Sequence, residues 1–159
     1  MESQELSAEQ LAELMIALAA RGVHNVNFVT PTHYVPQIAQ ALSVARPKGF
    51  DLPVVYNSSG FDSLETLLAI APDVDVYMPD VKWLSAQAGE QCANNSLYHE
   101  NIEAVVTEMY RQKGPLTLNA EGIVTRGVLI RHLVLPGGLS DSFEFLERFA
   151  PLIRAGVGV

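Results

Sequence analysis

The sequence is poor in the residues that build covalent or metal-held frameworks. It contains a single cysteine, Cys92, among 159 residues. One cysteine excludes an internal disulfide framework and any metal site made from several thiolates. The four histidines lack the close helical spacing of a zinc motif, so the sequence predicts no metal site.

Basic residues and long apolar runs are scarce as well. Ten lysines and arginines stand against eighteen acidic residues, which gives a net charge of -8. Such a chain is repelled by nucleic acid and by anionic membranes, so we expect neither as a partner. The sequence also lacks an apolar run of membrane length and a signal segment, and we therefore expect a cytoplasmic protein. Glycine-rich phosphate motifs are missing, which leaves dinucleotide and phosphate-loop binding without support.

What is present is typical of one globular domain over residues 1–159, because 48% of the residues are hydrophobic and 18% are charged. Apolar residues recur with strand spacing and helix spacing in turn. We predict strands at 23–29, 53–56, 75–82 and 127–135, and helices at 7–21, 35–45, 63–70, 97–111 and 140–150. Residues 85–96 are predicted to be irregular, residues 114–126 to form a surface loop, and the tail from Pro151 has no interpretable pattern.

This alternation predicts the fold class. Strands that alternate with helices pair in parallel through right-handed crossovers, so we expect an α/β fold, either an open sheet or an incomplete (β/α) barrel. Four strands do not close a barrel, and a partial barrel has two open edges. Since open sheet edges pair readily with other chains, the protein is expected to form a homo-oligomer.

The stretch Asp75–Lys82 is the strongest candidate for a functional segment. Its apolar alternation favours a buried strand, and its exit carries an acid and an amine, Asp80 and Lys82, two positions apart and hence on the same face. The carboxyl ends of strands in α/β folds line the ligand crevice, which makes this pair a site candidate. The alternative is a solvated ion pair that contributes under about 1 kcal/mol.

Polar residues follow the other strands too: Thr30, Thr32 and His33 after the first, Asn57 and Ser58 after the second, and Arg131 and His132 within the fourth. A polar set drawn to one pole of a sheet predicts a small-molecule site. The same side chains could instead cap helices or form turns, and Arg131 could pair with an internal carboxylate.

Four segments carry a resemblance to a known family: Asn25–Tyr34 (NVNFVTPTHY), Val54–Gly60 (VVYNSSG), Met78–Lys82 (MPDVK) and Arg131–Gly137 (RHLVLPG). In order and spacing they resemble the pyruvate formate-lyase activating enzyme-like branch of the radical SAM superfamily. The resemblance implies a (β/α)6 partial barrel that binds S-adenosylmethionine (SAM) against a 4Fe-4S cluster and cleaves it reductively to a 5'-deoxyadenosyl radical. In the activating enzymes this radical takes a hydrogen atom from a glycine of a partner protein.

The resemblance also implies a set of SAM-binding residues, namely Thr30, Thr32, His33, Asn57, Ser58, Asp80, Lys82 and Arg131. Asp80 and Lys82 fall on the Asp-x-Lys motif at the methionine end of the ligand, and Asn57 and Ser58 on an Asp-Thr pair near SAM. The Thr30–His33 segment departs from the Gly-Gly-Glu-Pro motif of many relatives. An acid next to an amine suits a zwitterionic amino acid, which needs both an acceptor and a donor.

One departure bears on the chemistry. Relatives carry a Cys-x-x-x-Cys-x-x-Cys loop just upstream of the segment that matches Ser7, and Cys92 cannot replace three thiolates that hold a cluster. We therefore expect a fragment that lacks the cluster-bearing strand and the last strand, and that does not cleave SAM. A second hypothesis is a non-catalytic α/β module that associates through its open sheet edges.

Overall fold

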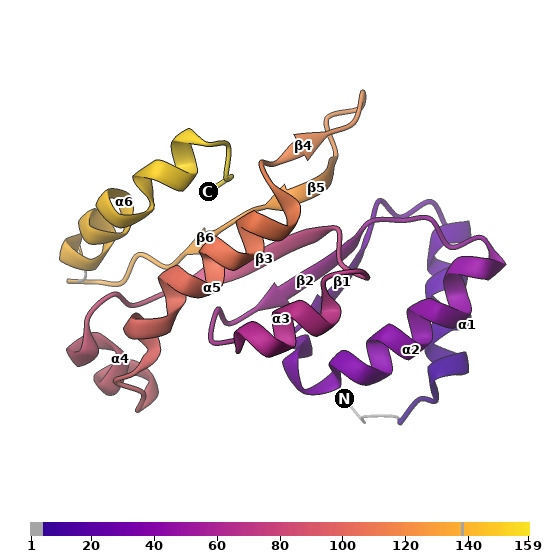
Figure 1. Ribbon diagram of the computed structural model, residues 1–159, viewed down its shortest axis with the longest axis horizontal. Helices are drawn as coiled ribbons and strands as arrows, with labels where there is room; N and C mark the ends of the chain where they lie inside the picture. The colour runs from indigo at the N-terminus through magenta and orange to yellow at the C-terminus, as the bar shows by residue number, and fades with distance from the viewer. Residues whose placement is uncertain (1–4, 138) are drawn as a thin grey trace.

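The computed structural model describes residues 5–137 and 139–159, and its elements follow the predicted alternation of strands and helices (Figure 1). In chain order they are α1 (Ala8–Ala20), β1 (Val26–Val29), the 3-10 helix η1 (Pro31–Tyr34), α2 (Val35–Ala45), η2 (Arg46–Lys48), β2 (Val54–Ser58), α3 (Leu64–Ile70), β3 (Val76–Val81), α4 (Ala86–Ala93), α5 (Tyr98–Lys113), β4 (Thr117–Leu118), β5 (Val124–Val128), β6 (Arg131–His132) and α6 (Leu139–Arg154).

The start of α1 shows how local sequence sets an element boundary. The Ser7 hydroxyl accepts a hydrogen bond from the Gln10 N–H at 3.2 Å, and the Gln10 side chain accepts one from the Ser7 N–H at 2.8 Å. This reciprocal pair satisfies two backbone donors that the first helical turn leaves without partners. The two hydrogen bonds form a capping box, and the predicted bounds of α2 at Val35 and Ala45 are confirmed.

The sheet is mixed and mostly parallel, with the strand order β1-β2-β3-β5-β4. β1, β2, β3 and β5 pair in parallel, β6 adds a parallel pair with β3, and β4 pairs with β5 in the antiparallel sense. The predicted α/β class is confirmed at this level. Since consecutive parallel strands are neighbours, their carboxyl ends lie at the same edge of the sheet.

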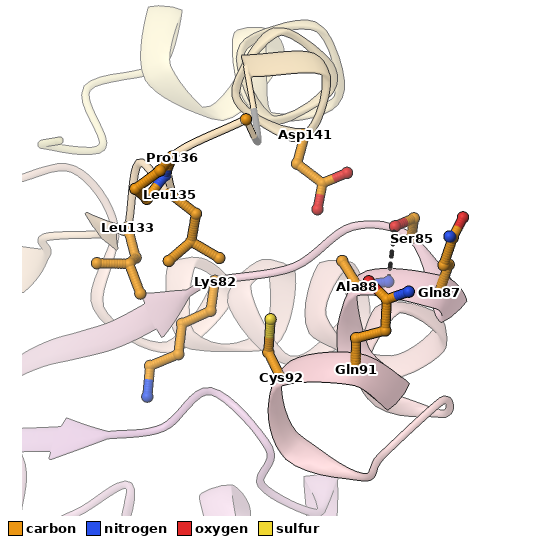
Figure 2. A pocket seen from close by; sticks show the side chains of 11 residues that line it. Lys82, Ser85, Gln87, Ala88, Gln91, Cys92, Leu133, Leu135, Pro136 and Asp141 are labelled. Atoms are coloured by element: carbon orange, nitrogen blue, oxygen red, sulfur yellow. Dashed lines mark hydrogen bonds between the residues drawn. The ribbon is translucent and has the colours of Figure 1, made fainter.

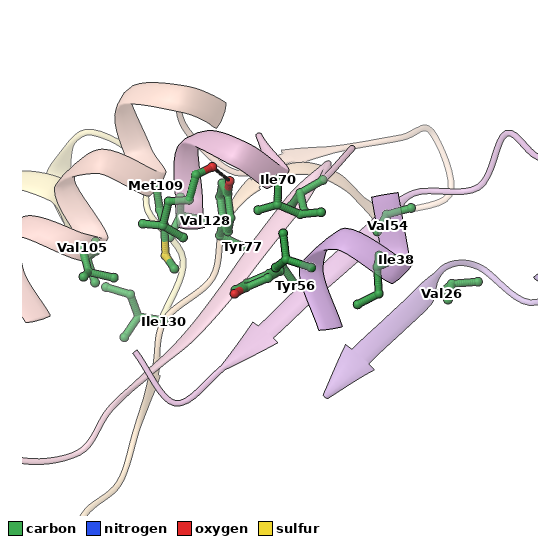
Figure 3. Close-up of a cluster of buried hydrophobic side chains, with 14 of the residues drawn as sticks. Val26, Ile38, Val54, Tyr56, Ile70, Tyr77, Val105, Met109, Val128 and Ile130 are labelled. Carbon is green, nitrogen blue, oxygen red and sulfur yellow. Dashed lines mark hydrogen bonds between the residues drawn. The ribbon is translucent and has the colours of Figure 1, made fainter. Parts of the chain in front are cut away.

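The core lies between the sheet and the helices α2, α3 and α5, which run along one of its sides (Figure 1). Tyr56 of β2 and Tyr77 of β3 are register partners, and their rings meet edge to face at 5.8 Å between centroids. Figure 3 shows them among Ile70, Val105 and Met109. Both tyrosines are almost fully buried, and burying one such ring stabilises the fold by about 2 kcal/mol. These contacts help to fix the register of β3 against β2.

The opposite face of the sheet carries the alternate residues of the same strands. Asn57 and Met78 are register partners there, and Asp80 follows two positions later on the same face. At the edge of this face Val29 of β1 is 70% exposed. Among the described residues no helix has the length and apolarity needed to cross a membrane.

Two segments that were predicted to be irregular contain regular structure. Residues 85–96 include α4, whose N-terminus is capped by the Ser85 hydroxyl at 3.2 Å from the Ala88 N–H and whose C-terminus is ended by Asn94 in the left-handed conformation. Helix α4 has the sequence AQAGEQCA and no large apolar side chain, so it has no clear apolar period to detect. Residues 114–126 include β4 and the start of β5, which form a hairpin. Its turn is held by the Asn119 side chain, which accepts from two backbone N–H groups.

The prediction for the last strand was partly wrong, and the tail, which had no interpretable pattern, contains regular structure. The run 127–135 is not one strand buried on both faces, because it divides into β5 and β6 and then leaves Leu133 and Val134 exposed. Helix α6 continues through Pro151, and the tail beyond it returns to the sheet. There Gly158 forms a parallel bridge with Leu129. A single bridge has no alternating pattern of apolar residues, so it cannot be predicted from periodicity.

Candidate functional site

The candidate site is a charge cluster at the carboxyl end of β3. Asp80 is 8% exposed, and its carboxylate is shared by two cations. Arg131 donates to Oδ1 through Nε at 2.8 Å and approaches the same oxygen through Nη2 at 2.7 Å. Lys82 places its Nζ 3.1 Å from Oδ2. Both oxygens of the buried carboxylate are therefore compensated, as a buried charge requires.

Strand register brings these three side chains together. β3 continues past Pro79 to Val81, so that Asp80 lies directly opposite Arg131 of β6 in the parallel ladder. Directly opposed residues project from the same face, and Lys82 shares that face because it is two residues beyond Asp80. The predicted pairing of an acid with an amine is present, and the arginine joins it through a contact across 51 positions of sequence.

The cluster carries a net positive charge, because two cations face one carboxylate. Lys82 is about a quarter exposed and Arg131 about half exposed, so both keep donors for a further group. With His132 and Leu133 the three residues line a cavity of about 260 Å³. Such a cavity suits a small anionic group, since a carboxylate or phosphate binds arginine and lysine through charge-assisted hydrogen bonds.

Tyr98, the first residue of α5, ties the loop after β2 to the end of β3. Its hydroxyl lies 2.5 Å from the Asp80 carbonyl and 3.0 Å from the Ser59 carbonyl, and it accepts from the Lys82 N–H at 3.3 Å. Burial raises the pKa of Tyr98, so the phenol stays protonated and remains a donor. The sequence interpretation missed this residue, although it lies on the buried face of α5 with Ile102 and Val105.

Gly60 allows the same close approach. It has φ +79, and a Cβ at this position would lie 2.3 Å from the Asp80 carbonyl oxygen and 2.5 Å from Cδ1 of Ile102. Only glycine fits both the left-handed backbone and the contact. The loop after β2 therefore packs directly on the backbone of the charge cluster.

The other residues predicted for the site are divided between two faces of the sheet. Asn57 shares the face of Asp80, whereas Ser58 points to the helix side and accepts a hydrogen bond from the Gly60 N–H at 3.1 Å. Thr30 has a left-handed backbone and donates its N–H to the Asn57 carbonyl at 2.8 Å. His33 is exposed in η1. Only Asn57 among these four shares a face with the charge cluster.

Thr32 belongs to a second polar cluster on the helix side of the sheet. Its hydroxyl donates to Asp62 Oδ1 at 2.7 Å, and the Tyr56 hydroxyl donates to the same oxygen at 2.9 Å. Burial raises the pKa of Tyr56, which keeps it a donor. Asp62 is 7% exposed, and its Oδ2 is buried without a partner among the described residues. The sequence interpretation did not select Asp62, because an acid near a helix start looks like an ordinary cap.

A further cavity of about 230 Å³ adjoins the charge cluster (Figure 2). Lys82 forms part of its wall and so connects the two spaces. The other walls come from α4, with Gln87, Gln91 and Cys92, and from the segment that includes Leu133 and Pro136. A ligand held at the charge cluster thus has room to extend beneath α4.

The fit of an iron-sulfur cluster can be tested on the residues themselves. The sequence contains one cysteine, and within residues 5–137 and 139–159 no three His, Cys, Asp or Glu side chains are grouped so that they could hold a metal ion. A 4Fe-4S cluster needs three thiolates with one open iron. The residues present do not fit that cluster.

Comparison with known proteins gives one informative relative. The uncharacterized protein MJ0674 of Methanocaldococcus jannaschii is 30% identical over 130 residues, a match that covers 78% of this chain and 33% of that protein. The chain thus spans about a third of the length of the curated relative it matches. No family model matches the chain, and no solved structure matches it. The name of the relative states no activity.

Proposed function

We propose that this chain is a SAM-binding part of a radical SAM fold of the pyruvate formate-lyase activating enzyme-like type. The observation that carries the proposal is the cluster of Asp80, Lys82 and Arg131 at the carboxyl end of β3. The parallel neighbours β1, β2, β3 and β5 follow one another in chain order, which supports an incomplete (β/α) barrel. The resemblance of the surrounding segments supplies the identity of the ligand.

The roles that we infer for these residues differ from those of a simple acid-and-amine pair. Both Asp80 oxygens already have a cationic partner: Oδ1 accepts a hydrogen bond from Arg131 and Oδ2 forms an ion pair with Lys82. The carboxylate therefore positions Lys82 and Arg131 and is not free for an ammonium group. We assign the remaining donors of the two cations to the carboxylate of the methionine moiety. Asn57, on the same face, offers an amide oxygen as an acceptor for the ammonium. The space beneath α4 is left for the rest of the ligand.

No reductive cleavage is assigned to this chain alone, because the described residues do not fit the cluster that would deliver the electron. Only the family resemblance supports a 4Fe-4S cluster and a protein substrate with a radical-bearing glycine. If the chain takes part in such a reaction, the thiolates must come from another polypeptide segment. Its own contribution is to bind and orient the amino acid end of SAM.

The binding proposal can be tested by calorimetric titration with SAM. Asp80→Ala and Lys82→Ala are each expected to weaken binding about tenfold or more, because a hydrogen bond to a charged group contributes roughly 1.5–3 kcal/mol. Lys48→Ala, which removes an exposed lysine in η2, is the matched control and should leave affinity unchanged. Decarboxylated SAM should bind as weakly to the wild type as SAM binds to the variants. Equal affinity for the two ligands would contradict the assigned carboxylate contact.

The absence of a cluster site is tested by anaerobic reconstitution with iron and sulfide. We expect no stoichiometric iron retained after desalting, no thiolate-to-iron charge-transfer absorbance, and no 5'-deoxyadenosine on addition of SAM and reductant. Cys92→Ser should behave like the wild type, since one exposed thiol cannot hold a cubane cluster. A full cluster in the wild-type chain would overturn this part of the proposal.

A second candidate is a non-catalytic α/β module that works by association. The observation that favours it is the edge strand β1, which has one neighbour in the described sheet and carries the exposed Val29. On this reading the chain is a homo-oligomer and gives no heat with SAM. Sedimentation of a monomer at high concentration would exclude the second candidate and leave the first unaffected.

A further inference from the structure

A larger cavity lies beside the charge cluster, beneath α6. Its volume is about 650 Å³, within the range of small-molecule sites. Seven of its lining residues are apolar, and they come from β3, the segment 129–134, α6 and the C-terminal residue: Met78, Leu129, Ile130, Val134, Phe145, Leu146 and Val159. The remaining three are Arg131, His132 and Ser142. A cavity with an apolar wall and one charged side chain suits an amphipathic ligand.

His132 and Ser142 are satisfied by contacts of their own. Nδ1 of His132 lies 2.8 Å from the Val81 carbonyl, which can only accept, so this nitrogen carries a proton. Nε2 lies 2.8 Å from the Ser142 hydroxyl, and the ring stacks on Phe145 at 4.4 Å between centroids. These contacts fasten α6 to the end of β6 and form a fixed wall.

Arg131 supplies the charge that the cavity offers to a ligand. Asp80 occupies one edge of the guanidinium, through Nε and Nη2, and leaves Nη1 outside that pair. The side chain is 52% exposed and lines this cavity as well as the smaller one next to Lys82. A planar guanidinium with a free edge is a preferred partner for a carboxylate.

We propose that the cavity beneath α6 binds a monocarboxylate with an apolar chain, whose carboxylate pairs with Arg131 while the chain lies against Met78, Phe145 and Leu146. Charge complementarity selects an acid, because a net positive cluster borders an apolar wall. Burial of the chain supplies the driving force, and the lone arginine fixes its direction. This site goes beyond SAM binding, since its apolar wall includes no residue assigned to SAM and Arg131 alone is common to both.

The test is a calorimetric titration with octanoate, with 1-octanol as the neutral ligand of the same chain length. Octanoate should bind wild type about tenfold more tightly than octanol, and Arg131→Gln should reduce octanoate to the affinity of octanol. Leu146→Glu places a carboxylate in the cavity wall. Because it repels the carboxylate of octanoate, this variant should not bind octanoate. Leu146 is 53% exposed, so this variant is expected to fold. Leu68→Glu, at an exposed leucine of α3 outside the cavity, is the control and should bind like wild type.

The outcomes separate this site from the SAM site. Leu146→Glu should still bind SAM, because Leu146 lines neither the cavity of the charge cluster nor the cavity beneath α4. Circular dichroism would verify that each variant is folded. Octanoate affinity equal to that of octanol, or unchanged in a folded Leu146→Glu variant, would refute the carboxylate site. If the wild type binds octanoate but not SAM, the proposed function is refuted and this inference stands.

Discussion

Substitution of Gly60 by alanine is expected to lower the free energy of unfolding by about 3 kcal/mol or more, which combines a left-handed backbone with overpacking. The new Cβ would lie 2.3 Å from the Asp80 carbonyl oxygen. That oxygen belongs to β3, whose position is fixed by its ladder with β2 and β6, so the loop must move instead. Urea denaturation followed by circular dichroism measures the loss, and SAM titration should show a weakened site.

Gly22→Ala is the matched control for this experiment. Gly22 has φ +77, nearly the same as Gly60, but a Cβ there would meet nothing within 4 Å. It should therefore show only the backbone cost, about 1 kcal/mol. If the two variants were equally destabilised, the contact between Gly60 and Asp80 would have no energetic weight, and the packing of this loop on the site would be disproved.

The second large effect on the free energy of unfolding is expected from removal of the Tyr98 hydroxyl. Tyr98→Phe keeps the ring, which lies 5.4 Å from Trp83 between centroids, but leaves the Ser59 and Asp80 carbonyls without the phenol donor. An unsatisfied buried acceptor costs about 1–3 kcal/mol, and we expect a loss of about 2 kcal/mol in the free energy of unfolding. Affinity for SAM should fall with it, because the Lys82 backbone loses its contact to the same hydroxyl.

The control for Tyr98→Phe is Tyr34→Phe, at a tyrosine that is 63% exposed in η1. Its stability should match that of wild type within experimental error, since water replaces whatever its hydroxyl contacts. A Tyr98→Phe protein as stable as this control, with unchanged SAM affinity, would show that the hydroxyl does not hold the loop after β2 to the end of β3.

The charge cluster explains why an acid is tolerated at a buried strand end. Asp80 alone would be costly at 8% exposure, and two cations offset that cost while leaving a net positive charge. Asp80 thus holds two donors, Lys82 and Arg131, in place and is not part of an isolated ion pair. Arg131 also lines two cavities, the one at the charge cluster and the apolar one beneath α6.

Local patterns were sufficient for several elements. Ser7 with Gln10 defines the start of α1, the apolar series in Val35–Ala45 defines α2, and Val26 with Phe28 marks the core face of β1. In each case the signal is a contact or a periodicity within a few residues, which the chain carries wherever it folds. The alternation of such segments also gave the parallel α/β class.

The elements that were missed depend on partners elsewhere. Helix α4 has no large apolar side chain, the hairpin of β4 and β5 is short, and the bridge of Gly158 to Leu129 is a single pair. None has enough periodic residues to stand out from a loop. In α6 the predicted apolar face comprised Phe143, Leu146, Phe149 and Ala150. The structure buries Phe149 as predicted, but it buries Phe145 beside it and leaves Phe143 and Leu146 exposed. The choice between neighbouring faces of an apolar helix is made by what it packs against.

The sequence by itself determined the alternation of the main strands and helices, and it selected the candidate pair Asp80 and Lys82, because two residues two apart in a strand must share a face. Only the tertiary structure decided that Arg131 joins them, that Ser58 and Thr32 lie on the other side of the sheet, and that Tyr98 and Gly60 support the cluster. These relations come from strand register and helix packing. The register that places Asp80 opposite Arg131 joins segments far apart in the chain, so it depends on which faces of both strands are buried in the folded sheet.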